Sequence, residues 1–407
     1  MRKIMLLFPL LTLACAQGPK KQYNWISLSE KGFTKNSLTI NKETKEFQSD
    51  KGFENLDLKK QIQADKNADT IKKIVLIGDT GCRLKESKYG DSYQNCKDPK
   101  DWAYASVMQK ISMENPDLII HVGDYHYREH CSEGKPCRKY TDMIGYGWRS
   151  WEADFFEPSQ EGFKVAPWIF VRGNHEDCKR AFEGYKLLSE QTWTEPCVKA
   201  EKTEYITLGN LLIVQLDTAS LNDKPESPET MVFWEQQFKD IEEKLKTNPA
   251  KQVWLVTHKP VTGLVDDGSG KLQTTNNNLQ KAFAKTGLGK KVEFMIGGHV
   301  HTTQFARAEG FPKQLVVGNA GSALDDAKAM QNRDAILKTK IDDLKFTDFF
   351  TDTKSEHSFG YAVMTKMDDL SWQLEFKDLE GKTTFTSLDS KLPGMKVEPK
   401  KKSTKKK

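Results

Sequence analysis

Short apolar runs that end abruptly in polar residues recur along the chain from residue 71 onward. Their length and their Gly, Asp or Asn boundaries are typical of strands buried on both faces. Amphipathic stretches at 101–115 and 228–248 predict helices between them. This strand–helix alternation predicts an α/β fold. The predicted strands are KKIVLIGD (72–79), DLIIHVGD (117–124), PWIFVRGN (167–174), LLIVQLD (211–217), QVWLVTH (252–258) and VEFMIGGH (292–299).

The ends of the chain are patterned differently. Residues 17–70 are rich in Lys and Asn and read as an N-terminal extension of short strands or linker, in which 24–29 and 36–43 alternate enough for a hairpin. Residues 358–366 and 371–388 have strand periodicity. We therefore expect one domain over 71–392, followed by a Lys-rich disordered tail at 393–407.

Residues 1–16 have the pattern of a signal peptide. Arg2 and Lys3 precede an apolar run that is too short to span a bilayer, and Ala14-Cys15-Ala16 supplies small residues. Two kinds of cleavage stay open: removal of Cys15, or acylation of Cys15 as in a lipoprotein, which would anchor the chain to a membrane. Either predicts an exported protein that is periplasmic, secreted or lipid-anchored at the cell envelope.

Six further cysteines follow, an even number that favours disulfides in an exported protein. Nearest-neighbour pairing predicts 82–96, 131–137 and 178–197, although six cysteines permit about fifteen connectivities. A metal cluster is the rival interpretation, but the sequence has no C-x-x-C. We therefore expect disulfides.

The net charge of +5 is concentrated in the tail. Residues 396–407 contain seven lysines and one glutamate, which leaves a net charge of −1 on the rest of the chain. A basic tail of this kind is a solvated segment rather than a basic domain face. We therefore expect no specific nucleic-acid binding, and the sequence leaves the oligomeric state open.

Polar residues follow the predicted strands at the ends where open α/β sheets place their sites. Oxygen donors interleaved with imidazoles suit a pair of first-row metal ions. Any one of these pieces is weak evidence, but five in sequence argue against coincidence. In order they are Asp79, Asp124 with Tyr127, Asn174 with His175, His258, and His299 with His301.

These residues lie in GDTG, GDYHY, GNHE, VTH and GHVH, which together resemble the ordered signature of calcineurin-like metallophosphoesterases over about residues 72–365. The usual first motif is D-x-H, but Gly81 stands here in place of the histidine. Tyr127 follows Asp124 by three residues. That combination resembles the purple acid phosphatases and exported bacterial enzymes of this type. The resemblance implies a β-sandwich flanked by helices, with a binuclear metal site at the carboxyl ends of strands.

The resemblance also implies the ligands of two metal ions. The first ion would be Fe(III) and the second a divalent ion, Zn, Fe or Mn. A phenol has a pKa of about 10 and ionises only beside a strong cation, which suits Tyr127 to Fe(III). The first ion would bind Asp79, Asp124, Tyr127 and His301, and the second would bind Asp124, Asn174, His258 and His299.

The implied activity is hydrolysis of small phosphate monoesters by metal-activated hydroxide, as in an acid phosphatase. His175 resembles the histidine that contacts phosphate and protonates the leaving group. Such enzymes usually have a further histidine beyond H-x-P, but HKPVTGLVDDGSGK contains none. The residues able to replace it are Lys259, Asp266, Asp267 and His126.

Two alternatives remain. A phosphodiesterase or nucleotidase could use the same metals, because substrate choice depends on loops. A surface-anchored binding protein with a vestigial site belongs to a different class, but the complete ligand set argues against it.

Overall fold

The computed structural model describes residues 21–40, 47–48, 71–86, 92–141, 143–189, 196–224, 227–326, 328–352 and 359–388. The predicted signal peptide (1–16), with Cys15, and the predicted tail (393–407) lie outside these residues. Most of 41–70 lies outside them as well.

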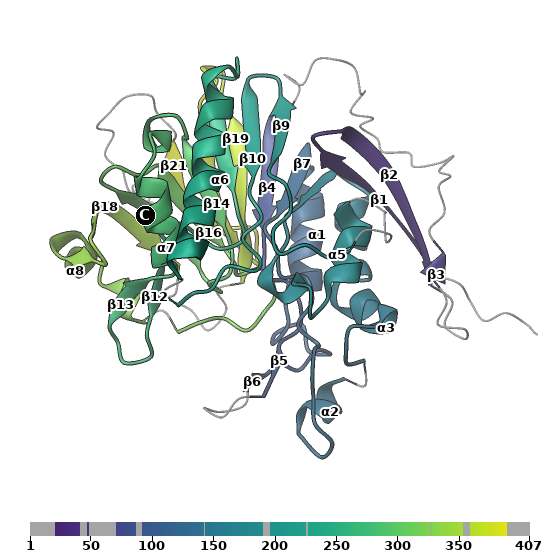
Figure 1. Ribbon diagram of the computed structural model, residues 1–407. Coiled ribbons are helices and arrows are strands. Elements are labelled where there is room, and N and C mark those ends of the chain that lie inside the picture. Colours follow the sequence, from purple (N-terminus) through teal and green to yellow (C-terminus); the bar gives the residue numbers. More distant parts are fainter. Residues whose placement is uncertain are drawn as a thin grey trace, which may run out of the picture.

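Two large mixed sheets form the centre of the fold (Figure 1). The nine-stranded sheet has the order β21 (Thr383–Leu388), β20 (Trp372–Asp378), β19 (Gly360–Lys366), β4 (Lys73–Ile77), β7 (Leu118–His121), β8 (Trp168–Phe170), β1 (Lys21–Ser29), β2 (Gly32–Ile40) and β3 (Phe47–Gln48). The eight-stranded sheet has the order β17 (Lys340–Ile341), β18 (Leu344–Thr351), β15 (Thr303–Ala308), β16 (Lys313–Val317), β14 (Phe294–Gly297), β11 (Gln252–Val256), β10 (Leu211–Gln215) and β9 (Glu204–Leu208). All six predicted core strands are confirmed, as are the late strands β19, β20 and β21.

The sheets pack face to face, and each outer face carries helices. In β4, Ile74 and Leu76 join the core shared by both sheets, whereas Val75 and Ile77 join the core under the helices. Both faces of the strand are therefore covered, which is why its sequence is apolar at every one of these positions. The predicted β-sandwich flanked by helices is confirmed.

The helices divide between the two outer faces (Figure 1). The nine-stranded sheet is covered by α1 (Tyr104–Glu114), α3 (Trp148–Trp151), the π-helix 152–156, α4 (Gln160–Phe163) and α5 (Phe182–Ser189). The eight-stranded sheet is covered by α6 (Pro228–Lys246) and α7 (Asn277–Ala284). The predicted helices at 101–115 and 228–248 are thus confirmed. In α6, Ser227 caps the first turn by accepting from the Thr230 amide, and Pro228 occupies the first helical position.

Smaller elements surround the edge of the sandwich at which the motifs gather. They are the hairpin of β5 (Leu84–Lys85) and β6 (Ser92–Tyr93), α2 (Cys137–Tyr140), the hairpin of β12 (Leu264–Asp266) and β13 (Leu272–Thr274), and α8 (Arg333–Lys338), with short 3₁₀ turns at 174–176 and 328–331. A further 3₁₀ turn at 288–290 precedes β14, at the opposite end of that strand.

Three disulfides join Cys82 to Cys96, Cys131 to Cys137, and Cys178 to Cys197. The nearest-neighbour pairing predicted from sequence is confirmed. The first two pack with Leu84 in a small core beneath the β5–β6 hairpin. Such bonds are typical of proteins outside the cytoplasm. Among the described residues, no helix combines the length and apolarity needed to cross a membrane.

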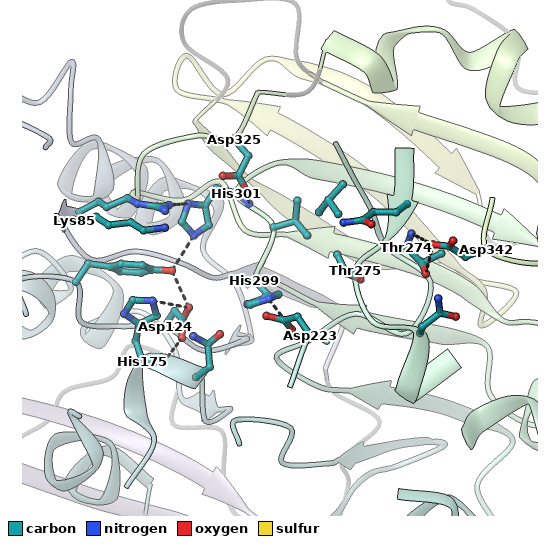
Figure 2. Close-up of a pocket in the computed structure, with 17 residues that line it drawn as sticks. Lys85, Asp124, His175, Asp223, Thr274, Thr275, His299, His301, Asp325 and Asp342 are labelled. Atoms are coloured by element: carbon teal, nitrogen blue, oxygen red, sulfur yellow. Dashed lines mark hydrogen bonds and ion pairs between the residues drawn. The ribbon is translucent and has the colours of Figure 1, made fainter. Parts of the chain in front are cut away.

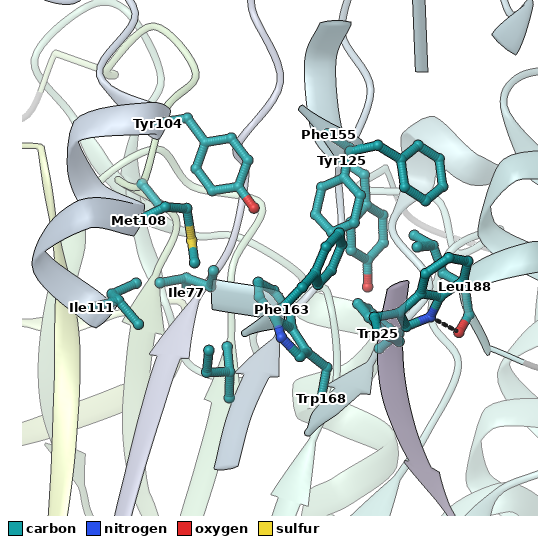
Figure 3. Packing of buried hydrophobic residues seen from close by; sticks show 14 of the residues in the cluster. Trp25, Ile77, Tyr104, Met108, Ile111, Tyr125, Phe155, Phe163, Trp168 and Leu188 are labelled. Carbon is teal, nitrogen blue, oxygen red and sulfur yellow. Dashed lines mark hydrogen bonds between the residues drawn. The ribbon is translucent and has the colours of Figure 1, made fainter. Parts of the chain in front are cut away.

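The N-terminal hairpin is part of the nine-stranded sheet. β1 pairs antiparallel with β2, as predicted, and parallel with β8 through Ser27 and Trp168. Trp25 of β1 is fully buried, and its indole N–H donates to the Leu188 carbonyl at 3.3 Å (Figure 3). The sheet therefore extends into the segment that the sequence analysis assigned to an N-terminal extension.

Replacing Trp25 by Ala should lower the free energy of unfolding by about 3–5 kcal/mol, because it removes a large buried ring from the core. Phe33 on β2 is 37% exposed, and Phe33→Ala should change the same quantity by less than about 0.5 kcal/mol. Urea denaturation of both variants checks this. Equal, small effects would mean that the hairpin is a dispensable appendage.

Candidate metal centre

The predicted ligands come from strands of both sheets. β4 and β7 run parallel and are followed by Asp79 and Asp124, while β11 and β14 run parallel and are followed by His258 and His299. The imidazole of His258 contacts the Val122 carbonyl at 2.8 Å, and the His299 amide donates to Asp79 Oδ2 at 2.9 Å. Strand ends of the two sheets therefore meet at one edge of the sandwich.

The Tyr127 phenol lies at the centre of the first predicted ligand set. Its oxygen is 3.1 Å from Asp79 Oδ1, 2.8 Å from Asp124 Oδ2 and 2.8 Å from His301 Nε2. The ring is buried. Four donor groups from three separate loops thus converge on one small volume.

The second predicted set adjoins the first through Asp124. His258 Nε2 lies 3.2 Å from Asp124 Oδ2 and 3.0 Å from Asn174 Oδ1. Asp124, His258 and His299 offer ligand atoms that all lie within 4.8 Å of one another. The structure therefore brings all seven predicted ligands together, with Asp124 shared between the two sets.

The donor chemistry fits two metal ions. His258 donates through Nδ1 to the Val122 carbonyl, and His301 donates through Nδ1 to the Ala323 carbonyl at 2.7 Å. These bonds leave Nε2 of each ring as a lone-pair donor that faces the carboxylates. Asp79 and Asp124 are buried, and buried carboxylates need compensating positive charge.

The protein alone holds Tyr127 in its neutral form. Burial, and then the carboxylates of Asp124 and Asp79, raise the pKa of the phenol well above its usual range. Burial by itself would lower the pKa of His258, but Asp124 raises it to about 9. Ionising the phenol therefore requires a strong cation at the carboxylates, which is what a metal ion supplies.

Three of the ligands have a backbone conformation that is costly for residues other than glycine. Asp79, Asp124 and His299 have φ values of 56°, 59° and 68°. Non-glycine residues with positive φ store about 1–3 kcal/mol each and are concentrated at functional sites. The fold thus accepts strain at these strand ends to aim three donor side chains at one point.

Gly81 explains why a tyrosine can enter the cluster. A Cβ atom at this position would lie 2.7 Å from the Tyr127 nitrogen and 2.9 Å from its ring carbon Cδ2. A histidine side chain at position 81 therefore has no room while Tyr127 keeps its place. Tyr127 and a histidine at position 81 would occupy the same space, so the presence of the tyrosine requires glycine at position 81.

His175 lies against the cluster in a fixed orientation. Its Nδ1 contacts Glu129 Oε1 at 2.7 Å, its ring centroid is 4.1 Å from that of Tyr127, and its Nε2 is 4.0 Å from Asp124 Oδ2. Glu129 was not among the site residues predicted from the sequence. The acidic residue two positions after Tyr127 was the available signal, but the contact depends on a loop that the sequence does not specify.

Two buried carboxylates, also missed as site residues, hold the loops that carry the ligands. Glu176 accepts from the backbone amides of Asp124, Tyr125, His126 and Gly173. Asp154 accepts from the amides of Cys82, Tyr127 and Arg128. The second-motif loop is therefore fixed by hydrogen bonds along its backbone.

The structure does not bring His126 to the cavity. Its ring is fully buried and packs against Trp151 and Tyr146, with centroid distances of 5.5 and 5.8 Å. Asp266 and Asp267 lie at the β12–β13 turn, where they accept from nearby amides of the same turn. Neither lines the cavity.

Lys259 reaches the metal cluster only through Asp223, which the sequence analysis did not identify. Lys259 Nζ lies 2.7 Å from Asp223 Oδ1, and that oxygen lies 3.3 Å from His299 Nε2. Burial opposes ionisation of Asp223, but His299 and Lys259 hold its pKa well below its usual range. Asp223 therefore stays ionised beside the second ligand set.

An open cavity of about 570 Å³ lies over the cluster. Figure 2 shows Asp124, His175 and His301 converging on it, with His299 turned toward Asp223. Its far side is lined by Thr274, Thr275 and Asn277 from the β12–β13 hairpin and the start of α7. The volume is adequate for a small polar substrate.

The sequence matches the family of calcineurin-like phosphoesterases over residues 72–303. Among the curated proteins, none matches. Similar solved structures include a purple acid phosphatase from yellow lupin, with 14% identity, 87% of this chain and 58% of that chain covered, and a TM-score of 0.48. The chain thus spans just over half of the lupin enzyme.

Two further structures are similar to this chain. The anchor protein of the inner membrane complex of Plasmodium has 13% identity, with 78% of this chain and 88% of that chain covered and a TM-score of 0.46. A dimetal phosphatase from Danio rerio has 11% identity, with 79% and 99% covered and a TM-score of 0.43.

Replacing Gly81 by Ala should displace Tyr127 and lower both metal content and stability, the latter by about 1–3 kcal/mol as for other overpacked sites. At Gly147 an added Cβ would meet nothing within 4 Å, and the φ of this residue is −73°, so Gly147→Ala is the matched control. Elemental analysis and urea denaturation measure the two effects. Full metal content in Gly81→Ala would contradict the packing argument.

Proposed function

The chain belongs to the calcineurin-like phosphoesterase family, and from this premise we propose that it is an exported phosphomonoesterase of the purple acid phosphatase type. The family implies a hydrolase with a two-metal centre. The finer assignment rests on one observation: the Tyr127 oxygen lies within 3.1 Å of Asp79, Asp124 and His301, beside a glycine that leaves no room for another ligand.

We assign Fe(III) to the set containing Tyr127, because phenolate is a hard donor, and a divalent ion (Zn, Fe or Mn) to the set containing His258 and His299. When bound, the ions would neutralise phosphoryl oxygens and provide an activated water for attack at phosphorus. We place Asp124 in both sets, because its Oδ2 lies 2.8 Å from the Tyr127 oxygen and 3.2 Å from His258 Nε2, while Oδ1 accepts from the His175 amide at 2.9 Å.

His175 is the proposed general acid. Glu129 holds its Nδ1, so the Nε2 proton faces the cavity, where a leaving oxygen would receive it. The contact at 2.7 Å also resists rotation of the ring. Phosphoryl transfer needs mainly positioning and charge neutralisation, and this pair supplies the proton that the departing alkoxide requires.

Asp223 and Lys259 lie beside His299 of the second ligand set. Their ion pair places a carboxylate against His299 and an ammonium behind it. Asp223 orients the His299 ring, while the Lys259 ammonium, buried and also bonded to the Leu221 carbonyl at 2.6 Å, balances its charge. Among the histidines outside the ligand set that the structure describes, only His175 lines the cavity as a proton donor.

Export is supported by the signal-peptide pattern of residues 1–16 and by three disulfides. Acylation of Cys15 would anchor the exported protein at the cell envelope. Labelling of the expressed protein with a radioactive fatty acid would detect it.

Metal analysis combined with Tyr127→Phe tests the assignment. The wild-type protein should contain one iron and one divalent ion per chain and show a visible tyrosinate-to-iron absorption band. Tyr127→Phe should lose that band and most of its iron, because the phenolate is the charge-transfer donor. Unchanged colour and iron would sink the purple-type assignment.

Activity across a panel of mono- and diesters, with metal content measured on the same sample, tests the substrate class. We expect aryl phosphate monoesters to be hydrolysed best at mildly acidic pH. Faster hydrolysis of diesters would favour a phosphodiesterase on the same site, and metal-free, inert protein would remove both enzyme assignments.

The His175–Glu129 contact predicts a graded loss of activity. His175→Asn should lower kcat about 10²- to 10⁴-fold by removing the general acid. Glu129→Gln should lower it about 10- to 100-fold, as expected when the partner of a catalytic histidine is replaced, with Glu129→Asp intermediate. Substrates with strongly acidic leaving groups should be much less sensitive, since they need no proton. Equal losses on good and poor leaving groups would contradict the assigned role.

A further inference from the structure

A second, smaller cavity adjoins the metal centre on the side of the β5–β6 hairpin. Its volume is about 320 Å³. It shares Arg83, Lys85, Tyr127 and His175 with the cavity over the cluster, so the two cavities adjoin. Because Arg83 and Lys85 line both cavities, a substrate that fills the cavity over the cluster can reach them.

Arg83 and Lys85 supply positive charge where the cavities join. They are two positions apart in an extended segment, so their side chains share one face. Leu84 between them turns the other way and packs with Cys82 and Cys96. Figure 2 shows Lys85 beside His301 and Asp325.

The segment is held firmly. Arg83 exchanges two hydrogen bonds with Gln94, from its amide to the Gln94 side chain at 2.8 Å and from the Gln94 amide to its carbonyl at 2.9 Å. The Cys82–Cys96 disulfide closes the same hairpin, and the Leu84 amide donates to the Tyr127 carbonyl at 3.3 Å. The two cations are thus presented by a scaffold tied to a metal ligand.

Their charges are poorly balanced within the protein. In the part of the chain that the structure describes, neither side chain has a carboxylate within ion-pair distance, and Arg83 Nε is buried without a hydrogen-bond partner. Burial, and then the like charge of Arg83, lower the pKa of Lys85, against the opposing influence of Asp325. Two cationic side chains that line the same cavities, with no carboxylate in ion-pair contact, favour an anion between them.

The position of Arg83 separates this anion from the phosphate that is cleaved. Arg83 Nη1 lies 2.9 Å from Nδ1 of His301, whereas the Tyr127 oxygen and Asp79 Oδ1 face Nε2 of the same ring. The imidazole ring of His301 therefore separates the guanidinium from the other predicted ligands of the first set. A phosphate at the metal centre and an anion at Arg83 occupy distinct places.

We propose that Arg83 and Lys85 bind a second phosphate carried by the leaving group, so that the substrates are phosphomonoesters of alcohols that bear another phosphate. The inference rests on the proposed function and names its substrate class. Water adds to the scissile phosphorus and releases one proton to the solvent. The bond to the alcohol oxygen breaks, and that oxygen keeps the electron pair and takes a proton from His175.

The experiment compares one nucleoside with one or two phosphates: adenosine 3′,5′-bisphosphate against the 3′- and 5′-monophosphates. The ratio of kcat/KM for the bisphosphate to that for either monophosphate should exceed one in the metal-loaded protein. Lys85→Gln and Arg83→Gln should each lower that ratio about 10- to 100-fold, the loss expected for a hydrogen bond to a charged group.

Lys97→Gln is the matched control, because Lys97 is exposed beside the same disulfide and lines neither cavity. It should leave the ratio unchanged. Metal content is measured in every variant, since Arg83 Nη1 lies 2.9 Å from His301 Nδ1, whereas Lys85 forms no hydrogen bond or ion pair with a predicted ligand among the residues that the structure describes. Lys85→Gln therefore tests the inference free of any effect on the ligands.

Equal losses on all three substrates would show that the cations bind the scissile phosphate, and would overturn the proposal. A ratio insensitive to both variants, or a wild-type preference for monophosphates, would overturn it as well, while leaving the phosphomonoesterase assignment intact. If the metal-loaded protein hydrolyses none of the three and no aryl phosphate, the proposed function fails and this inference with it.

Discussion

Burial of the Asp79 and Asp124 carboxylates at the junction of the two sheets is the constraint on which the rest of the site depends. Both side chains are almost fully removed from solvent, and charge in that position is tolerated only with strong compensation. Burial by itself would raise the pKa of Asp124, yet His258 and His175 hold it well below its usual range. The same carboxylates keep Tyr127 protonated until a cation arrives. A bound metal ion would therefore supply the positive charge that the buried carboxylates of Asp79 and Asp124 need.

That constraint accounts for features that would otherwise be unrelated. Bringing the carboxylates close to histidines of the other sheet requires left-handed backbone at Asp79, Asp124 and His299. It also requires close backbone approach, because a Cβ at Gly173 would lie 2.1 Å from the Asp124 nitrogen, and one at Gly298 would lie 2.3 Å from Asp79 Oδ2. A side chain at either glycine of these motifs would clash with a predicted ligand, so packing requires glycine there.

Much of this could be predicted from local sequence, and the remainder could not for identifiable reasons. Each core strand is buried on both faces, so it could be predicted from its short apolar run and from the polar residue that ends the run. Glu129, Asp154 and Asp223 act through contacts across 46, 27 and 76 positions, respectively, and no local pattern marks such pairs. His126 illustrates the converse: its neighbours in sequence are site residues, but its ring lies in the aromatic core beside Trp151.

The sequence by itself determined the strand–helix alternation and which residue types stand at the strand ends, because these depend on periodicity and side-chain chemistry along the chain. It indicated the disulfide pairing only as the nearest-neighbour choice among about fifteen connectivities. Only the tertiary structure decided that the N-terminal hairpin completes a sheet, that Gly81 makes room for Tyr127, and that Arg83 and Lys85 share a cavity with His175. The physical reason is that burial, steric exclusion and charge balance depend on which side chains lie close together in space. In this fold those side chains come from segments that are far apart in the sequence.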